Sequence, residues 1–348
     1  MLEKIYYSIR KNHVKKPIYL IYFVTNICNS KCNHCFYSKQ LNRPENKDLT
    51  LNEINNFSKQ LGKLIWLSFS GGEPFMRKDI TEVYNIFLKN NKFSNFTIPT
   101  NGILTDTIYK KTREMLMIKK IKSFSLNLSL DGPKEIHNQI RGVSCYDNVF
   151  KTYDKVKSLK KEFPFFSIKV STTLSNKNIN YLKELHKEVH NRMPEINFHN
   201  FEIMRGDAKN HDYNPPTIEE LYKNKEIIFK IWDDYQFYDK KISSRIALNA
   251  KKEIFNTYIQ ILKTKKQPFM CYAGRIHAVL DNNGDIYFCE LLNKIGNIRQ
   301  KSFSEIWHSE EANKLRDSIK NRECYCTHSC FQNTNFIFKK SNWLKLVR

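Results

Sequence analysis

The sequence contains no long hydrophobic run and no export signal. No uninterrupted apolar stretch approaches the ~20 residues that a membrane-spanning helix needs. The start of the chain also lacks the apolar core of a signal peptide, because basic side chains are spread through it: Lys4, Arg10, Lys11, Lys15 and Lys16. These absences predict a cytoplasmic protein without a membrane span. The 41% of hydrophobic residues suffice for a sizeable core, which excludes a disordered chain.

Acidic residues are also scarce. The 348 residues include 35 Asp and Glu against 58 Lys and Arg, a net charge of +23. Such an excess favours anionic partners, for example phosphorylated substrates, nucleic acid or a membrane surface. The charge is spread along a chain that is rich in lysine, asparagine and isoleucine throughout, and it forms no blocks. We therefore predict no nucleic-acid partner.

Nine cysteines are present, and three of them stand close together. In a chain without export signals they indicate a reducing compartment and metal ligation rather than disulfides. Cys28, Cys32 and Cys35 have the spacing C-x3-C-x2-C and follow an apolar run, 18–25, that is typical of a buried strand. Three thiolates on one short loop can hold three corners of a cubane iron–sulfur cluster and leave one iron free for a small molecule. Cys145 is expected to be a plain buried thiol.

Two other interpretations of the three-cysteine loop remain open. Zinc can be held by cysteines, although zinc sites usually pair such a motif with a second pair of ligands. The cysteines could also be structural thiols, but their clustering just after a strand argues against this.

Strand-like and helical patterns alternate from residue 18 onward. Thr50 and Glu53 form one predicted capping box, and Asp79 and Glu82 form another. Gly62 is expected to end the first of these helices in a left-handed conformation. Six strand–helix units predict an α/β fold with a parallel sheet, a partial (β/α)6 TIM-like barrel. The predicted strands are 18–25, 64–70, 95–99, 124–130, 165–173 and 196–203.

Polar motifs follow these strands, at the end where such barrels carry their chemistry. Gly71 and Gly72 allow a backbone to approach a ligand closely, and the carboxylate of Glu73 can accept hydrogen bonds from an ammonium group. Ser129 and Asp131 lie two residues apart, hence on one side of a strand end, and suit ribose hydroxyls. Further polar residues follow the third to sixth strands: Thr100, Asn101, His137, Arg141, Thr172, Thr173 and Arg205.

The sequence resembles the radical S-adenosylmethionine (SAM) superfamily. The resemblance rests on the C-x3-C-x2-C loop, on Ser70-Gly-Gly-Glu-Pro74 and on the stretch 129–142. In this family the free iron of a [4Fe–4S] cluster chelates the amino and carboxylate groups of SAM. One electron then cleaves SAM to methionine and a 5′-deoxyadenosyl radical, which takes a hydrogen atom from the substrate. The family also shares the partial barrel.

The resemblance assigns residues to a SAM pocket. Glu73 would bind the methionine amino group, Arg141 would pair with the SAM carboxylate in a bidentate fork, and His34 would pack beside the bound cofactor. A solvated loop histidine is the alternative for His34, and surface polar residues around a turn are the alternative for Arg141 and His137. The predicted SAM-binding set is His34, Gly71, Gly72, Glu73, Thr100, Asn101, Ser129, Asp131 and Arg141.

A different unit begins at Cys271. Two short apolar runs, 275–280 and 285–288, are joined by Asp281-Asn-Asn-Gly284, which is a strong hairpin signal. Ser302-x-x-Glu305 predicts the cap of a helix that continues to about Ile319. The spacing Cys271-x12-Gly284-x4-Cys289 resembles the opening of SPASM/twitch domains, which carry auxiliary iron–sulfur clusters.

The number of cysteines in this unit distinguishes the two domain types. A full SPASM domain supplies seven cysteines for two clusters, whereas this chain offers five, so the resemblance implies the twitch type with a single auxiliary [4Fe–4S] cluster. Cys271 and Cys289 are the first two ligands. Cys326 and Cys330 are favoured over Cys324, because their x3 spacing matches the last pair of the SPASM pattern. A four-cysteine zinc site is the alternative.

Glu290 directly follows Cys289 and is the candidate catalytic base. A carbon radical loses an electron to the auxiliary cluster more easily when a proton leaves too, and several family members place an acidic residue here. A surface residue at a hairpin end is the alternative. The predicted domains are a basic lead-in (1–17), the radical SAM barrel (18–208), a helical bridge (209–265), the twitch/SPASM domain (266–335) and a tail (336–348).

The predicted function is that of a radical SAM oxidoreductase or modifying enzyme acting on a small-molecule or glycan-type substrate. Only 17 residues precede the first strand, whereas dedicated peptide-modifying members often carry an added N-terminal domain. A ribosomal-peptide maturase is the first alternative. A non-catalytic iron–sulfur redox or metal-binding protein is the second, but it would not need the Gly-Gly-Glu motif of a SAM pocket. The resemblance also implies an external one-electron reductant such as flavodoxin or ferredoxin.

Overall fold

The computed structural model describes residues 16–236, 242–339 and 341–342. The predicted lead-in lies almost entirely outside these ranges, and the predicted tail lies partly outside them. Within them, no helix is both long enough and apolar enough to cross a membrane.

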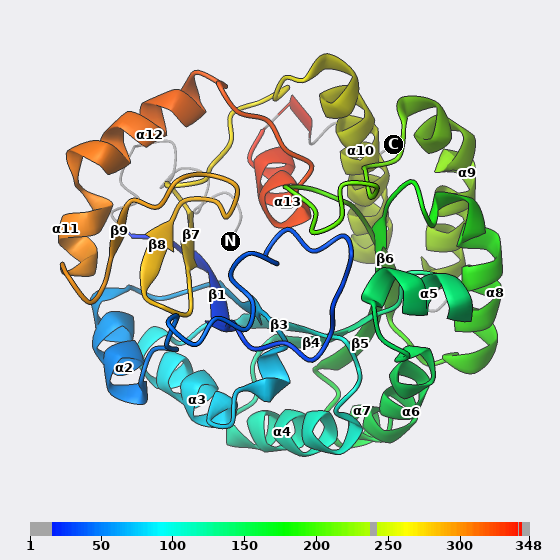
Figure 1. The fold of residues 1–348 in the computed structure, drawn as a ribbon, viewed down its shortest axis with the longest axis horizontal. Helices are drawn as coiled ribbons and strands as arrows, with labels where there is room; N and C mark the ends of the chain where they lie inside the picture. The colour runs from blue at the N-terminus through cyan, green and yellow to red at the C-terminus, as the bar shows by residue number, and fades with distance from the viewer. Residues whose placement is uncertain (1–15, 237–241, 340, 343–348) are drawn as a thin grey trace.

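Nine strands form one sheet in the order β6-β5-β4-β3-β2-β1-β7-β8-β9. The first six pair in parallel with their neighbours in the chain, and helices surround them (Figure 1). Since β6 and β9 are the two edges, the sheet is the predicted partial barrel. The strands are β1 (Tyr19–Thr25), β2 (Trp66–Gly71), β3 (Asn95–Thr100), β4 (Ser123–Ser129), β5 (Phe166–Leu174), β6 (Phe198–Ile203), β7 (His277–Leu280), β8 (Asp285–Tyr287) and β9 (Gly296–Asn297).

The helices fall into an outer layer around the barrel and a C-terminal group. The outer layer comprises α2 (Leu51–Gln60), η1 (Pro74–Met76), α3 (Ile80–Asn91), α4 (Thr105–Ile118), α5 (Lys134–Arg141), α6 (Tyr146–Val156), α7 (Leu159–Glu162), η2 (Ile179–Tyr181) and α8 (Leu182–Arg192). The remaining helices are α9 (Ile218–Gln236), α10 (Ile242–Thr264), α11 (Phe303–Trp307), α12 (Glu310–Lys320) and α13 (Ser329–Ile337).

The predicted hairpin is present, but it does not form a separate sheet. β7 and β8 are antiparallel, and Gly284 in their turn has a φ of +93°, which glycine adopts without strain. β7 also pairs in parallel with β1, from Tyr19 opposite His277 to Tyr22 opposite Leu280. The C-terminal unit therefore extends the barrel sheet at its β1 edge.

Two of the predicted helix caps are confirmed. Thr50 Oγ1 accepts a hydrogen bond from the Glu53 amide at 3.3 Å, and Glu53 accepts one from the Thr50 amide at 2.7 Å. Ser302 and Glu305 make the same reciprocal pair. The helix after Ser302 is shorter than predicted, because it stops at Trp307 and a second helix starts with Ser309 as its N-cap.

Two other local predictions were wrong. Asp79 precedes α3 but makes no capping hydrogen bond; its carboxylate accepts instead from Arg77 Nε at 2.7 Å. The C-cap of α2 is Leu61 in an extended conformation, and Gly62 is not among the residues with positive φ. The chain therefore leaves α2 as an extended segment toward β2.

The two faces of the barrel sheet differ in chemistry. Along β5 and β6, buried residues alternate with half-buried ones. The buried set is apolar on β5, apart from Thr172, and packs outward, with Phe166, Ile168 and Val170 in the main core and Leu174 in a second cluster. The half-buried set faces the lumen and is largely polar: Ser167, Lys169, Ser171 and Thr173 on β5, and Asn200 and Glu202 on β6.

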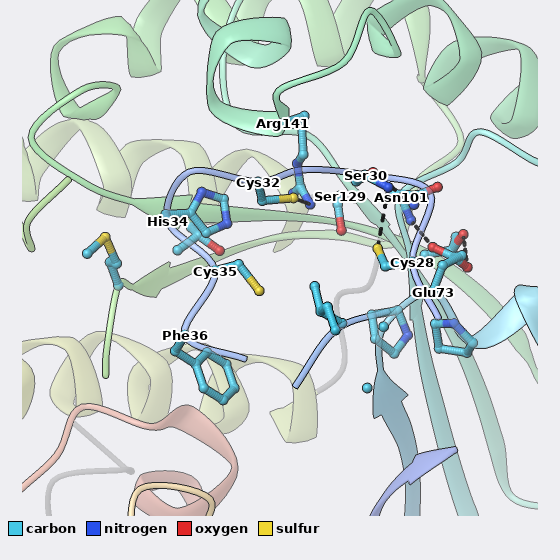
Figure 2. A pocket seen from close by; sticks show the side chains of 18 of the residues that line it. Cys28, Ser30, Cys32, His34, Cys35, Phe36, Glu73, Asn101, Ser129 and Arg141 are labelled. Atoms are coloured by element: carbon cyan, nitrogen blue, oxygen red, sulfur yellow. Dashed lines mark hydrogen bonds between the residues drawn. The ribbon is translucent and has the colours of Figure 1, made fainter. Parts of the chain in front are cut away.

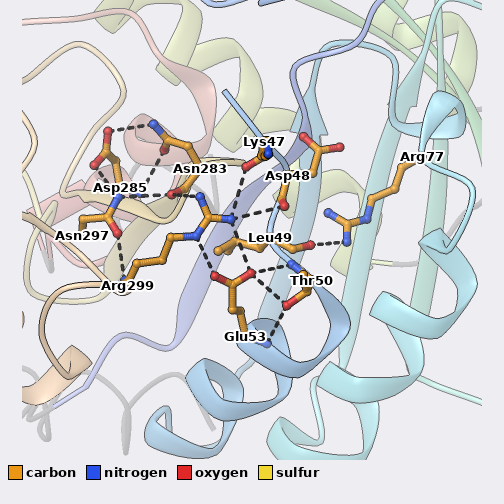
Figure 3. A network of polar contacts seen from close by, with 10 residues as sticks. All are labelled: Lys47, Asp48, Leu49, Thr50, Glu53, Arg77, Asn283, Asp285, Asn297 and Arg299. Atoms are coloured by element: carbon orange, nitrogen blue, oxygen red, sulfur yellow. Dashed lines mark hydrogen bonds and ion pairs between the residues drawn. The ribbon is translucent and has the colours of Figure 1, made fainter. Parts of the chain in front are cut away.

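A polar network fastens the C-terminal unit to the barrel (Figure 3). Arg299, just after β9, donates to Glu53 at the start of α2 at 2.6 Å. It also donates to the carbonyl oxygens of Asn283, Lys47 and Asp48. One guanidinium thus links α2, the loop before it and the β7–β8 turn.

Removing this guanidinium should cost stability. The hydrogen bond from Arg299 is the main cause that holds the pKa of Glu53 at about 2. A depressed carboxylate pKa contributes stability above its ordinary value of ~4.3, and that contribution is lost as the pH falls toward 2. We expect Arg299→Gln to lower the free energy of unfolding by about 1 kcal/mol at pH 7, measured by thermal unfolding.

The matched control is Lys314→Gln, which removes an exposed ion pair with Glu310 on α12. Such pairs contribute little, so this variant should unfold like the wild type. Equal losses in both variants would contradict a special role for Arg299.

Candidate active site

A cavity of about 230 Å³ lies at the carboxyl ends of the barrel strands. Figure 2 shows the three cysteines of the 28–35 loop around it, with Glu73 and Asn101 on one side and Arg141 above. Its lining is Cys28, Ser30, Cys32, His34, Cys35, Phe36, Leu41, Gly71, Gly72, Glu73, Pro74, Pro99, Thr100, Asn101, Ser129, Arg141, Thr173, Met204 and Arg205. The structure therefore brings together eight of the nine predicted SAM-binding residues, all except Asp131.

The cysteine loop is held on one side by the two glycines after β2. The Gly72 amide donates to Thr25 O at 2.8 Å, and the Glu73 amide donates to Ile27 O at 2.9 Å. A Cβ on Gly72 would lie 2.2 Å from Ile27 O, and Gly71 has a φ of +113°. Any larger side chain at position 72 would push the loop away, which explains the Gly-Gly pair physically.

The end of α5 holds the other side of the loop. The amides of Lys31 and Asn33 donate to the carbonyl oxygens of Arg141 and Ile140, at 3.0 and 2.8 Å. Gly142, with a φ of +65°, lets Lys31 O approach to 2.6 Å of where a Cβ would stand. The loop is thus fixed by backbone contacts on both sides.

The thiols of this loop are half-buried, and Arg141 is the cation that lies nearest to Cys32 and Cys35 among those that act on them. Burial raises the pKa of Cys28 to about 12 and that of Cys35 to about 11. A cluster binds cysteines as thiolates, and its iron would supply the positive charge that such buried sulfurs need. In the described ranges, no three His, Cys, Asp or Glu side chains are grouped to hold a single metal ion.

Glu73 offers a buried carboxylate to the same cavity. It accepts hydrogen bonds from Thr100 Oγ1 at 2.9 Å and from the amides of Asn101 and Phe75 at 2.7 and 3.3 Å. Burial nevertheless raises its pKa to about 7. An ammonium group in the cavity would relieve that cost of burial. The residues present therefore fit both a cluster and the amino group of SAM.

Asp131 does not line the cavity. It is fully buried, and its carboxylate forms an ion pair with Arg141 Nη2 at 2.7 Å and accepts from the Thr173 amide at 2.9 Å. The Asp131 amide in turn donates to His137 Nδ1 at 3.0 Å. In this structure Asp131 orients Arg141, whose Nη1 lies 3.7 Å from Cys32 Sγ, rather than facing a ribose.

Two histidines named from the sequence, His34 of the predicted SAM-binding set and His137, lie at or behind the cavity wall. Burial lowers the pKa of His34 to about 4, and its Nδ1 has no hydrogen-bond partner. His34 is therefore a neutral ring in the cavity wall rather than a solvated loop residue. His137 is buried behind the cavity, and its Nε2 lies 3.3 Å from Cys145 Sγ, which is buried as expected.

Four of the five C-terminal cysteines each have at least one other of the four as an electrostatic neighbour. Burial raises the pKa of Cys289 well above its usual range, and nearby Glu290, Cys326 and Cys271 raise it further. Burial likewise raises the pKa of Cys271, and Cys324 adds to this effect.

Cys330 has a different environment. Burial raises its pKa to about 11, while a hydrogen bond with Tyr19 at the start of β1 lowers it. Glu202 on β6 is another close neighbour. Cys330 therefore faces the side of the barrel between β1 and β6.

A polar triad of Arg205, Glu290 and His328 lies between the cavity and the C-terminal cysteines, and burial lowers the pKa of His328 below its usual value. Glu290 is 5% exposed and pairs with Arg205 Nη2 at 3.1 Å and with His328 Nε2. Arg205 lines the cavity and its guanidinium lies over the Phe36 ring, 5.0 Å from the centroid. The sequence marked Glu290 and Arg205 separately, but it gave no reason to include His328, which appeared only as a residue between two cysteines.

Comparison with protein families agrees with this site. The model of the radical SAM superfamily matches residues 22–189, and the SPASM model, an iron–sulfur cluster-binding domain, matches residues 271–331. An AdoMet-dependent heme synthase of Methanosarcina barkeri is 26% identical over 86% of this chain and 85% of its own length. A cysteine-type anaerobic sulfatase-maturating enzyme of Clostridium novyi is 25% identical over 92% of this chain and 84% of its own.

Solved structures share the fold. SuiB of Streptococcus suis bound to S-adenosylmethionine gives a TM-score of 0.63 at 17% identity and covers 89% of this chain and 70% of its own. Native anSMEcpe with bound AdoMet gives 0.60 at 18%, with 86% and 82% covered. The cofactors of the chain are accordingly SAM, the SAM-binding [4Fe–4S] cluster and auxiliary iron–sulfur. From its cysteine loop to its C-terminal cysteines, this chain belongs to the radical SAM superfamily and carries a C-terminal SPASM domain.

Proposed function

We propose that this protein modifies a peptide or protein substrate by hydrogen-atom abstraction. The observation that carries the proposal is the match to sulfatase-maturating enzymes along 92% of this chain, together with a strand-end cavity lined by residues of the cluster loop and by Met204 and Arg205, which follow β6. Such relatives span nearly the whole chain, so the short lead-in does not argue against a peptide. The comparisons thus favour the maturase alternative over the small-molecule or glycan substrate that the sequence suggested.

Each cavity residue has a proposed role. Cys28, Cys32 and Cys35 would hold the SAM-binding cluster, and Glu73 would bind the methionine amino group. When bound and reduced, the cluster supplies the electron that cleaves SAM and so makes hydrogen-atom abstraction available. Arg141 would bind the SAM carboxylate. The remaining SAM-binding residues would be His34, Gly71, Gly72, Thr100, Asn101 and Ser129.

The C-terminal cysteines would hold the auxiliary cluster. Cys271, Cys289 and Cys326 would be three ligands, with Cys324 or Cys330 as the fourth. These cysteines would hold the auxiliary cluster on the side of the Arg205–Glu290–His328 triad away from the cavity, because Glu290 directly follows Cys289. Arg205 would then be the residue that meets the substrate from that side.

The contacts of Glu290 favour a positioning role over that of a base. Although burial opposes its charge, His328 and Arg205 hold the pKa of Glu290 at about 2. A general base works best with a pKa near the operating pH, and Glu290 does not line the cavity. We propose that it fixes Arg205 at the cavity wall.

The substitution Glu290→Gln separates the two roles. It should keep both clusters and SAM cleavage, and product formation should fall modestly if Glu290 only positions Arg205. Loss of a base would instead lower product formation by ~10²–10⁴-fold. Arg205→Lys is the matched variant, since it should reproduce the modest loss. A Glu290→Gln loss beyond about 100-fold with an unaffected Arg205→Lys would contradict positioning.

The substrate class itself can be tested with reconstituted protein, SAM and dithionite. Peptides encoded beside the gene for this chain should accelerate 5′-deoxyadenosine formation. The peptides themselves should also change in mass. Acceleration by tetrapyrroles alone would support the second candidate, a small-molecule substrate, which the heme synthase relative favours. Acceleration by neither class, with SAM cleavage intact, would contradict both.

A one-electron donor would reach the cluster from the outside of its loop. Cys32 and Cys35 also line a groove of about 350 Å³ that carries the exposed lysines 31, 39 and 209, of which Lys39 pairs with Asp207 at 2.6 Å. An acidic protein such as flavodoxin would suit this charge. Lys31→Glu with Lys209→Glu should slow cluster reduction by flavodoxin about ten-fold at low salt, and leave reduction by dithionite unchanged. Equal rates with flavodoxin would contradict this docking site.

A further inference from the structure

One lysine of β5, Lys169, faces the lumen of the barrel. Lys169 stands in the middle of β5, and its side chain belongs to the half-buried set that faces the lumen. The same strand face carries Thr173, which lines the SAM cavity. Within the described part of the chain, Lys169 makes no hydrogen bond or ion pair. Its half-buried ammonium group is therefore available to an anionic ligand.

Neighbouring strands place further polar groups beside this lysine. Asn127 on β4 is its direct partner in register, and Asn127 Oδ1 is buried without a hydrogen bond. Two residues further along these strands, Ser129 lines the SAM cavity. At about 3.3 Å per residue, the Lys169 layer therefore lies about 7 Å below the cavity wall.

A second lysine, Lys251 on α10, lies beside β6. Lys251 on α10 donates to Asn200 Oδ1 on β6 at 2.7 Å and lies over the Phe198 ring, 4.8 Å from its centroid. Phe198 is the register partner of Lys169. Figure 1 shows α10 and α13 on the side of the ring between β6 and β7. The two lysines thus approach the same layer, Lys169 from β5 and Lys251 from α10 beside the neighbouring strand β6.

The balance of charge in this layer is positive. Burial, together with the nearby charge of Lys251, lowers the pKa of Lys169 to about 8. Burial lowers the pKa of Lys251, while Glu202, one layer higher on β6, raises it. No acidic group has a comparable effect on Lys169. An anion beside Lys169 would therefore remove an uncompensated charge.

We propose that Lys169, Lys251 and Asn127 form a subsite in the lumen that binds a carboxylate of the substrate. This rests on the proposed peptide substrate, because a peptide offers such a group as an acidic side chain or as its C-terminus. The carboxylate would sit below the SAM cavity, and the reacting residue of the same peptide would remain at the level of Thr173 and Arg205. The side-chain Nδ2 group of Asn127 would donate to the carboxylate alongside the two ammonium groups.

Three small probes test the subsite on the reconstituted holoenzyme with SAM. They are N-acetyl-glutamate N-methylamide, N-acetyl-alanine and the neutral N-acetyl-glutamine N-methylamide, with binding measured by calorimetry. We expect the glutamate or the alanine probe to bind at least about ten-fold more tightly than the neutral probe. The tighter of the two identifies the side-chain or the C-terminal carboxylate as the recognised group.

Substitutions test whether the preference for a carboxylate probe arises at Lys169. Lys169→Met should abolish it, Lys169→Arg should keep most of it, and Lys187→Met, an exposed lysine on α8, should leave it unchanged. Iron content and SAM binding show that each variant is folded, and Lys251→Gln tests the second lysine if Lys169→Met does not fold. Equal binding of all three probes would overturn the subsite. Turnover of peptides is not needed for this test, so failure of the proposed function would leave its result standing.

Discussion

Replacing Cys28, Cys32 and Cys35 together with alanine should lower the iron content of anaerobically reconstituted protein from about eight to about four per chain. The remaining iron would belong to the C-terminal cysteines, whose contacts lie on the other side of the Arg205–Glu290–His328 triad. The same variant should form no 5′-deoxyadenosine, because no iron would remain at Glu73 and Arg141 to receive SAM. Iron, sulfide and zinc analysis on matched preparations measures the effect.

Cys145→Ala is the control for the cysteine variants. Cys145 is buried beside His137, and its loss should leave the iron content near eight. A wild-type preparation that saturates at about four irons and holds zinc at residues 271–330 would contradict the auxiliary cluster.

Arg141→Met should destabilise the protein and also weaken SAM binding. Removing Arg141 leaves Asp131 as a buried carboxylate without a cation, and such broken pairs cost about 3–5 kcal/mol. Although burial opposes its charge, Arg141 lowers the pKa of Asp131 below its usual value. The stability that this pair contributes is therefore present above the ordinary carboxylate pKa and is lost as the pH falls through the depressed one.

Denaturant unfolding of the apoprotein at pH 7, together with equilibrium binding of SAM to the holoenzyme, measures both effects. Lys134→Met on the same helix breaks an exposed ion pair with Asp147 and should cost less than about 1 kcal/mol. Adding Asp131→Asn to Arg141→Met should recover part of the stability but none of the SAM binding. Full stability in Arg141→Met alone would contradict the buried pair.

The barrel could be predicted because its signals are local. Each strand is a short apolar run followed by a helix start, and Thr50 and Ser302 carry their caps within four residues. The end of α2 was missed because Gly62 permits a left-handed conformation without requiring one, and the chain instead turns extended at Leu61. The pairing of β7 with β1 joins residues about 260 positions apart, and no local pattern encodes such a partner.

In the site, too, local patterns could be predicted and contacts between distant segments could not. The cysteine loop, Gly71, Gly72 and Glu73 could be placed because their spacing alone matches a family. Asp131 was expected to face a ribose, since its spacing from Ser129 puts both at one strand end. The spacing could not show that Arg141, ten residues later, forms an ion pair with the carboxylate of Asp131. The triad of Arg205, Glu290 and His328 is likewise assembled by the fold from three distant segments.

The central claim is that the cavity binds SAM at the cluster of Cys28, Cys32 and Cys35 and cleaves it reductively. Its most direct test is 5′-deoxyadenosine formation by anaerobically reconstituted protein with SAM and dithionite, without any substrate. Slow release of 5′-deoxyadenosine and methionine is predicted for the wild type, and none for Cys32→Ala. A wild-type protein with its full iron content that neither binds nor cleaves SAM would contradict the account and leave a redox or metal-binding protein in its place.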